Sequence, residues 1–159
     1  MTLKIGILSD SHGWIHPEII SLMNRCDKII HAGDIMEENT LKAFTAPLIA
    51  VRGNNDEHLA FADIETLDLP GGKLVVEHGH KHGWQTPSHD ALRAAHAEAK
   101  VIVYGHTHKQ LINTEISPWI VNPGASGAIR NRGSSKCLVL AIDDKQNWKF
   151  ITHNFTNGV

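Results

Sequence analysis

One pattern recurs five times in the first 108 residues: a short apolar run that ends in glycine and polar residues. Each run has the length and the β-branched content of a buried strand bounded by turn residues. Helix signals lie between several of the runs, so strands and helices alternate. This alternation predicts a largely parallel sheet covered by helices on both faces. The five predicted strands span residues 3–8, 28–31, 48–51, 74–77 and 101–104.

The other predicted elements are three helices and a C-terminal group of strands. Residues 17–25 begin with proline, residues 88–100 begin with a serine cap and are rich in alanine, and residues 38–44 form a shorter helix candidate. Strands are predicted over residues 111–116, 119–122, 136–142 and 148–155, with a hairpin turn at 143–146. No Pro/Gly/Ser linker separates this part, which we interpret as a β-meander of the same domain. We therefore expect one α/β sandwich domain over residues 1–159.

Composition argues against several classes of protein. Fifteen basic and 17 acidic residues give a net charge of −2, which offers no broad attraction for long nucleic acid. No segment approaches the roughly 20 apolar residues of a membrane span, and the N-terminus turns polar too early for a leader peptide. Cys26 and Cys137 are far apart and are expected to be buried free thiols in a reducing compartment. We therefore expect a cytoplasmic protein without a membrane partner.

The polar residues at the strand ends are the expected functional site. The carboxyl ends of parallel strands meet at one edge of a sheet, so residues between positions 10 and 108 should converge there. Taken singly, Asp10 can be a cap and Asn54 can occupy a left-handed turn position. As a set, nitrogen and oxygen ligands without cysteine are typical of reactive first-row metal sites. The expected metal ligands are Asp10, His12, Asp34, Asn54, His78, His106 and His108.

The order of these motifs resembles a known family. The blocks are Asp10-Ser11-His12, Gly33-Asp34, Gly53-Asn54-Asn55-Asp56, His78-Gly79-His80 and Gly105-His106-Thr107-His108. They resemble the calcineurin-like metallophosphoesterases, and most of all the YfcE-like single-domain phosphodiesterases. The resemblance implies a four-layer α/β/β/α sandwich of mixed sheets and a site with two divalent metal ions. Mn²⁺ is the first expectation for these ions, with Ni²⁺, Fe²⁺, Co²⁺ and Zn²⁺ as alternatives.

The resemblance also assigns roles by matching position. It implies one ion on Asp10, His12 and His108, a second ion on Asn54, His78 and His106, and a bridge formed by Asp34. A hydroxide between the two ions would attack phosphorus in line. Asp34, Asn54 and Asn55 are then the expected catalytic residues. His31 and His80 are expected to support the ligands, because metal-bound side chains usually need such partners.

Asn55 marks a departure from many relatives of this family. These relatives carry a histidine at this position, which contacts the phosphate and can protonate the leaving oxygen. Asn55 can still donate a hydrogen bond to phosphate, but we expect esters with poor leaving groups to react slowly. His58 and His82 are weaker candidates for the missing acid.

The leading functional prediction is hydrolysis of a small phosphodiester. A phosphomonoesterase is the alternative within the enzyme class, and a non-catalytic scaffold like the retromer subunit of this family is the alternative outside it. Trp14 and Trp84 follow ligand loops and are either stacking platforms for substrate or packing anchors. A homo-oligomer is a further expectation, based on Trp119 and Trp148 in the late strands.

Overall fold

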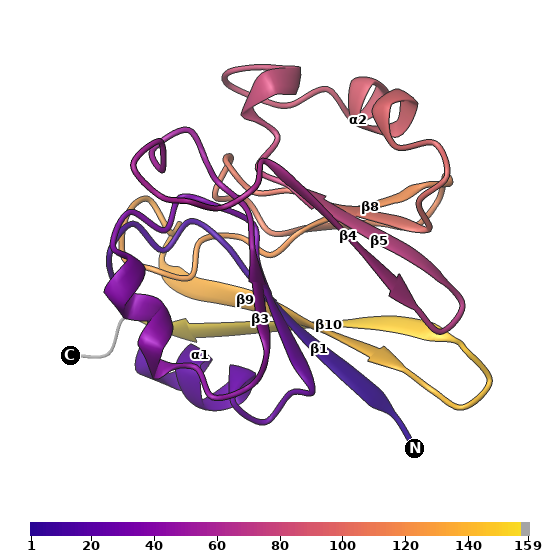
Figure 1. Ribbon diagram of the computed structural model, residues 1–159, viewed down its shortest axis with the longest axis horizontal. Helices are drawn as coiled ribbons and strands as arrows, with labels where there is room; N and C mark the ends of the chain where they lie inside the picture. Colours follow the sequence, from indigo (N-terminus) through magenta and orange to yellow (C-terminus); the bar gives the residue numbers. More distant parts are fainter. Residues whose placement is uncertain (157–159) are drawn as a thin grey trace.

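Two mixed sheets packed face to face form the centre of the computed structural model, which describes residues 1–156 (Figure 1). The first sheet has the strand order β10-β9-β1-β2-β3, in which β1, β2 and β3 are parallel and β9 and β10 form an antiparallel edge. Its strands are β1 (Leu3–Leu8), β2 (Lys28–His31), β3 (Leu48–Ala50), β9 (Ser134–Ile142) and β10 (Trp148–Thr156).

The second sheet has the order β4-β5-β6-β8-β7. Strands β5, β6 and β8 are parallel, and the edge strands β4 and β7 are antiparallel to their neighbours. Its strands are β4 (Ile64–Leu69), β5 (Gly72–Glu77), β6 (Val101–Val103), β7 (Leu111–Asn113) and β8 (Trp119–Asn122).

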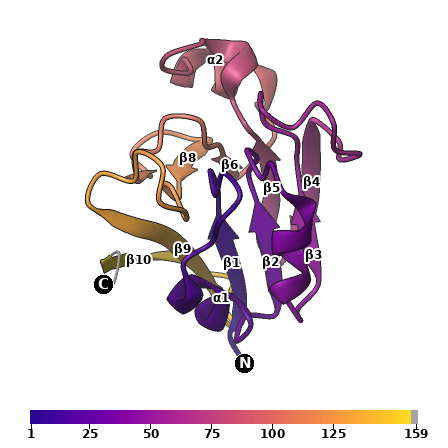
Figure 2. The same cartoon turned by 90° about the vertical axis from the view of Figure 1, so that its left-hand side faces the viewer.

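Three of the four apolar clusters lie at interfaces between layers, and these interfaces define four layers. The main core lies between the sheets and combines residues such as Ile7 and Ile30 with Val76 and Val103. Helix α1 (Pro17–Met23) packs on the outer face of the first sheet, and helix α2 (His89–Ala95) covers the second sheet. Figure 2 shows the two helices on opposite sides of the paired sheets. The α/β/β/α arrangement implied by the family resemblance is confirmed.

The prediction from periodicity alone was wrong about the sheets. The strands form two sheets, and helices cover one face of each. The prediction had a single sheet with helices on both faces. The C-terminal strands are not a meander, because β7 and β8 join the second sheet while β9 and β10 join the first. The hairpin turn at 143–146 is confirmed, since β9 pairs with β10 on either side of it.

Several element boundaries also differ from the prediction. Helix α2 is shorter than residues 88–100, although Ser88 caps it as expected by accepting a hydrogen bond from the backbone of Ala91. Residues 38–44 form only a 3₁₀ helix, η1 (Glu38–Ala43), and a second one, η2 (His80–His82), was not predicted. Strand β4 was missed because it is a half-exposed edge strand. None of the helices in residues 1–156 is long and apolar enough to cross a membrane.

The two cysteines and the tryptophans of the late strands are buried or partly buried. Cys26 and Cys137 are buried free thiols, as expected. The Trp148 side chain belongs to the main core, and Trp119 packs against that core. Trp148 therefore offers almost no exposed surface and Trp119 only part of its own, and the homo-oligomer stays a prediction.

Candidate metal centre

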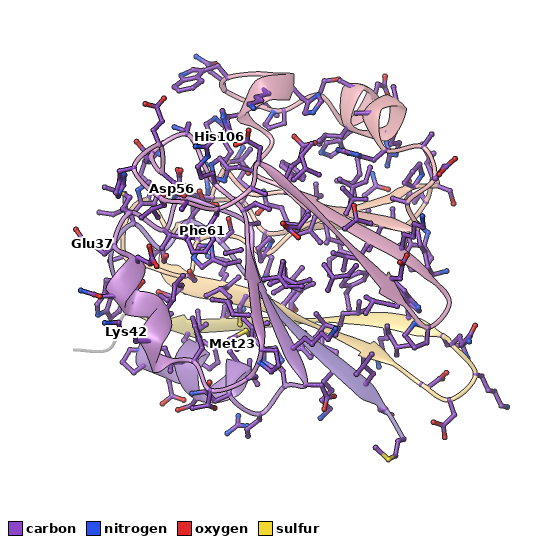
Figure 3. All side chains as sticks on the ribbon, in the orientation of Figure 1. Met23, Glu37, Lys42, Asp56, Phe61 and His106 are labelled. Atoms are coloured by element: carbon purple, nitrogen blue, oxygen red, sulfur yellow. The ribbon has the colours of Figure 1, made fainter. Side chains whose placement is uncertain are left out.

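The loops that follow β1, β2, β3, β5 and β6 lie at the same end of the two sheets, as the strand-end argument predicted. Figure 3 labels Asp56 and His106 in two of these loops, which approach each other from different sheets. Backbone hydrogen bonds join the loops directly, because Asp10 N donates to Gly33 O at 2.9 Å and His12 N donates to Asp34 O at 3.0 Å. The site therefore rests on the main chain of several strands.

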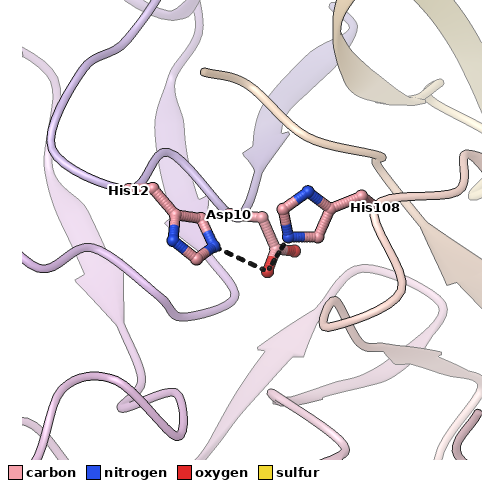
Figure 4. A group of neighbouring side chains, drawn as sticks. All are labelled: Asp10, His12 and His108. Atoms are coloured by element: carbon pink, nitrogen blue, oxygen red, sulfur yellow. Dashed lines mark ion pairs between the residues drawn. The ribbon is translucent and has the colours of Figure 1, made fainter. Parts of the chain in front are cut away.

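Five of the seven expected ligands form a central cluster: Asp10, His12, Asp34, His78 and His108. Figure 4 shows the imidazoles of His12 and His108 pointing at one oxygen of Asp10, with Nε2 to Oδ1 distances of 4.0 and 3.4 Å. His78 Nε2 lies 3.7 Å from the same oxygen and 3.3 Å from Asp34 Oδ2. His12 Nε2 is 3.4 Å from Asp34 Oδ2. Both carboxylates thus share histidine neighbours.

Four buried atoms of this cluster lack a hydrogen-bond partner among the described residues: Asp10 Oδ1 and the Nε2 atoms of His12, His78 and His108. Buried polar atoms are nearly always paired, so a group of four unpaired atoms facing one another requires an explanation. Each of them is a potential metal ligand, and the separations of 3.3–4.0 Å suit atoms that share an ion. The donor set therefore fits the metal centre expected from the family.

Backbone carbonyls fix which nitrogen of two histidines faces the cluster. The Nδ1 atom of His78 lies 2.8 Å from Ala32 O, and that of His108 lies 2.8 Å from Ile129 O. A carbonyl can only accept, so Nδ1 carries a proton in each ring, and Nε2 is the nitrogen that can act as the ligand atom when the ring is neutral. This is the usual support for a metal-bound histidine.

Electrostatics in the cluster favour positive charge. Burial by itself lowers the pKa of His78, but Asp10 and Asp34 outweigh it and raise that pKa to about 9. Burial raises the pKa of Asp34, but the neighbouring His78 ring and hydrogen bonds from Asn55 hold it well below its usual range. Carboxylates buried at such a site call for cations, which protons on histidine or metal ions can supply.

Asn55 holds the carboxylate of Asp34. Its backbone N–H donates to Asp34 Oδ1 and its side-chain amide donates to Asp34 Oδ2, both at 3.0 Å. The predicted hydrogen bond from Asn55 to phosphate stays a prediction, and it would require this amide to divide its two N–H groups between Asp34 and the substrate.

The remaining two expected ligands, Asn54 and His106, lie beside the cluster and contact each other. Asn54 Oδ1 is 3.1 Å from His106 Nδ1, and the other ring nitrogen of His106 contacts the carbonyl of Trp84. The ring centroids of His78 and His106 are 5.2 Å apart. The backbone N–H of His106 also donates to Asp10 Oδ2 at 3.0 Å. The backbone of the His106 loop is therefore fixed to the cluster, although the His106 side chain is turned toward Asn54.

Five of the expected ligands have a left-handed backbone conformation: Asp10, His12, Asp34, His106 and His108 have φ between 47° and 73°. They are five of the nine non-glycine residues with positive φ in residues 1–156. Such conformations cost free energy and concentrate at functional sites. Four of these five residues, all except His106, belong to the central cluster, so the backbone and the side-chain geometry mark largely the same residues.

Two buried residues support the loops without joining the cluster. His31 Nδ1 accepts from Gly33 N at 3.1 Å and its Nε2 donates to Ser11 Oγ at 2.9 Å, so it holds neighbours of the expected ligands in the chain and not the ligands themselves. Asp56 accepts three backbone N–H groups, from Ile35, Met36 and Gly53. The sequence analysis gave Asp56 no role, although it lies in a ligand motif.

Other histidines do not enter the cluster. His58 is exposed and contacts Met36 O, and His82 pairs with Glu77, so both have their contacts outside the central cluster, and their role as an acid stays a prediction. His80 packs near the rings of His78 and His106, with its Nδ1 buried and without a hydrogen-bond partner among the described residues.

A cavity of about 300 Å³ adjoins the cluster. It is lined by Asn54, Trp84, Gln85, His106, Thr107, Arg130 and Arg132. The two arginines come from the loop between β8 and β9 and bring positive charge to the wall of the cavity. Neither arginine was among the residues predicted for the site.

Comparison with known proteins identifies the family of the chain. The model of the calcineurin-like phosphoesterase superfamily domain matches residues 3–145. A probable metallophosphoesterase of Bacillus subtilis is 32% identical over 89% of this chain and 86% of its own. A phosphodiesterase of Methanocaldococcus jannaschii is 28% identical over 77% of this chain and 83% of its own.

Solved structures agree with the fold as well. The structure of an archaeal phosphodiesterase is similar with a TM-score of 0.70 and 26% identity, covering 95% of this chain and all of that one. A Vps29 mutant from Entamoeba histolytica has a TM-score of 0.75 at 18% identity over 97% of this chain and all of its own, a likeness of fold alone. The chain belongs to the calcineurin-like phosphoesterase superfamily and to its branch of small single-domain proteins.

Proposed function

We propose that the protein is a metal-dependent phosphodiesterase that hydrolyses a small phosphoester. The observation that carries this proposal is the convergence of four buried, unpartnered ligand atoms on the space between Asp10 and Asp34. Purely structural histidines would have their ring nitrogens paired. The similarity to a protein named a phosphodiesterase supports the diester class.

The ligand assignment that we propose follows the motif positions. Asp10, His12 and His108 would hold one ion, Asn54, His78 and His106 the other, with Asp34 between them. When bound, two such ions polarise the phosphoryl oxygens and allow a water to ionise near neutral pH. Mn²⁺ is our first choice, with Ni²⁺, Fe²⁺, Co²⁺ and Zn²⁺ as alternatives, because imidazole and carboxylate ligands accept all of them.

The residues of the chain prepare this chemistry. The carbonyls of Ala32 and Ile129 accept from Nδ1 of His78 and of His108. When these histidines are neutral, the single ring proton is therefore on Nδ1, and Nε2 is free to bind an ion. Asn55 orients both oxygens of Asp34. His106 would have to exchange its contact with Asn54 or with Trp84 for an ion, so that part of the site rearranges on loading.

The cavity beside the cluster is the proposed substrate site. Arg130 and Arg132 suit an anionic substrate, because guanidinium groups pair with phosphate oxygens in a planar fork. The Trp84 side chain is 67% exposed and lies 5.6 Å from the His106 ring, centroid to centroid, where it can stack on an aromatic leaving group.

The test is metal analysis of purified protein, followed by hydrolysis assays on paired diester and monoester substrates with added Mn²⁺, Ni²⁺ or Zn²⁺. We expect two ions per chain at the central cluster, chelator-sensitive activity and faster diester cleavage. Asp34→Asn should abolish activity and lower metal content, because it removes the charge between the two ions. Asp63→Asn is the matched control, since Asp63 pairs with Arg52 and Lys81 on the surface.

The other outcomes separate the alternatives. Preferential monoester cleavage would replace the diester assignment with a phosphomonoesterase. Metal binding without hydrolysis of either ester would favour the scaffold. Near-normal turnover of Asp34→Asn would refute the two-metal site itself.

A further inference from the structure

A second group of metal-binding side chains lies at the end of β5, on the face that α2 covers. It consists of Glu77, His82 and His96, and one ligand atom from each lies within 4.8 Å of the others. Glu77 Oε1 is 3.0 Å from His82 Nε2, and Glu77 Oε2 contacts His96 Nε2 directly. We propose that this trio is a mononuclear site for Zn²⁺ or a similar first-row divalent ion, separate from the central cluster.

The alternation of side chains along β5 explains why the trio is separate. Val76 faces the core between the sheets, whereas Val75 faces the outer layer with Leu92 of α2. Glu77 follows Val76 and so projects to the same outer side as Val75. His78, the next residue, belongs to the central cluster. Adjacent residues at the end of β5 thus serve two different sites.

The chemistry of the trio fits zinc. Two imidazoles and one carboxylate, with a remaining position for water, form a three-ligand set that zinc accepts. Ligands about 2.0–2.1 Å from a tetrahedral ion lie about 3.3 Å from each other. The Glu77 to His82 separation of 3.0 Å is already close to this value, so an ion requires small outward movements of the side chains and not a new fold.

Burial makes an ordinary surface cluster a poor explanation. The side chains of Glu77, His82 and His96 are only 5%, 21% and 11% exposed. A buried carboxylate needs a positive partner, and one protonated imidazole would be enough. Here both imidazoles direct Nε2 at the same carboxylate, with ring centroids 6.5 Å apart. An ion would satisfy all three groups after displacing any proton on the two nitrogens.

Solvent can reach the trio from two sides. Glu77 and His82 line a cavity of about 150 Å³, and His96 lines another of about 380 Å³. The three ligands come from the end of β5, from η2 and from the C-terminal cap of α2. A bound ion would therefore tie η2 and α2 to the sheet. The segment between these two elements carries Trp84, which contacts His106 of the central cluster.

The first experiment locates the ion directly. Crystals of the wild-type protein grown with Zn²⁺ should show an anomalous peak about 2.0–2.2 Å from Nε2 of His82, Nε2 of His96 and an oxygen of Glu77. Absence of this peak, with or without ions in the central cluster, would overturn the proposal. Loss of the central ions alone would instead contradict the proposed function and leave this site standing.

The second experiment measures binding at micromolar free metal. Equilibrium dialysis should find one more Zn²⁺ per chain in wild type than in His96→Asn or in Glu77→Gln. His89→Asn is the matched control, because His89 lies on the same helix but contacts Tyr104, and it should bind as many ions as wild type. If His96→Asn and wild type bind equal numbers of ions, the trio is a hydrogen-bonded cluster only and the proposal is wrong.

Discussion

Asp56 allows a quantitative test of how the loops around the metal centre are held. We predict that Asp56→Asn lowers the free energy of unfolding by about 3–5 kcal/mol. The carboxylate is fully buried, and it accepts from Gly53 N and Met36 N at 2.8 Å and from Ile35 N at 3.1 Å. An asparagine keeps one acceptor oxygen, so at least one N–H loses its partner. That loss costs about 1–3 kcal/mol, and the two neutral bonds that remain are weaker by about 1 kcal/mol each.

The assay is thermal and urea unfolding of metal-free protein, followed by circular dichroism. Each kcal/mol shifts the midpoint of a chain of this size by about 2–4 °C, so the variant should melt about 6–20 °C below wild type. Asp143→Asn is the matched control. Asp143 also accepts three hydrogen bonds, from Lys145 N, Asn147 N and Asn147 Nδ2, but it is exposed in a hairpin turn.

Water can replace the acceptor that Asp143→Asn loses, so its effect should be much smaller. Equal losses in the two variants would refute the reasoning, because they would show that burial of Asp56 adds nothing to its three hydrogen bonds.

Three further predictions concern the neighbours of the cluster. Burial lowers the pKa of His31 to about 4, so between pH 6.5 and pH 4 the imidazole binds a proton mainly in the unfolded chain. Metal-free wild type should therefore lose roughly 3 kcal/mol more stability than His31→Gln over this pH range. Urea unfolding that changes equally with pH in both proteins would contradict this. Gly53→Ala should lower the metal content measured by mass spectrometry, because its Cβ would lie 2.1 Å from Asp34 Oδ1. Full metal occupancy in this variant would contradict the prediction, since it would show that the loop can move to accommodate the Cβ. Asn55→His should speed cleavage of alkyl esters more than that of aryl esters, because the new imidazole can protonate a poor leaving group, with a gain below the ~10²–10⁴-fold range of acid catalysis. A wild-type rate that is already insensitive to the leaving group would show that another residue supplies the proton.

The convergence of the site could be predicted from the sequence because it depends on strand direction. Each apolar run before a polar block is a buried parallel strand, and parallel strands bring their carboxyl ends together. Asp10, Asp34 and His78 meet for this reason, although β1 and β2 belong to one sheet and β5 to the other.

Pairing partners could not be predicted in the same way. Residues 119–122 have the composition of a strand, but nothing local shows that β8 lies parallel to β6 and not beside β9. The choice depends on which apolar faces cover each other once the sheets meet. Trp148 illustrates this dependence, because an indole in the last hairpin suggests a surface for a partner but fills the core between the sheets.

The contact partners of the side chains at the site could not be predicted from the sequence either. The motif containing Asn54, Asn55 and Asp56 indicates a functional loop but not the partner of each side chain. In the structure Asn55 binds Asp34, Asp56 binds backbone N–H groups and Asn54 meets His106. Three adjacent polar residues therefore have three different tasks, which depend on the directions in which this loop presents their side chains.

The free-energy cost of the site is itself an argument that it is functional. Asp10, His12 and His108 adopt left-handed backbone conformations, each of which costs about 1–3 kcal/mol. Asp10 Oδ1 and the Nε2 atoms of the two histidines are buried without hydrogen-bond partners among the described residues, and this burial adds a second free-energy cost. A chain selected for stability alone would avoid both features. Because both costs fall on the same residues, and because a cation shared by these atoms would offset the second, the cluster is better explained by ion binding than by packing.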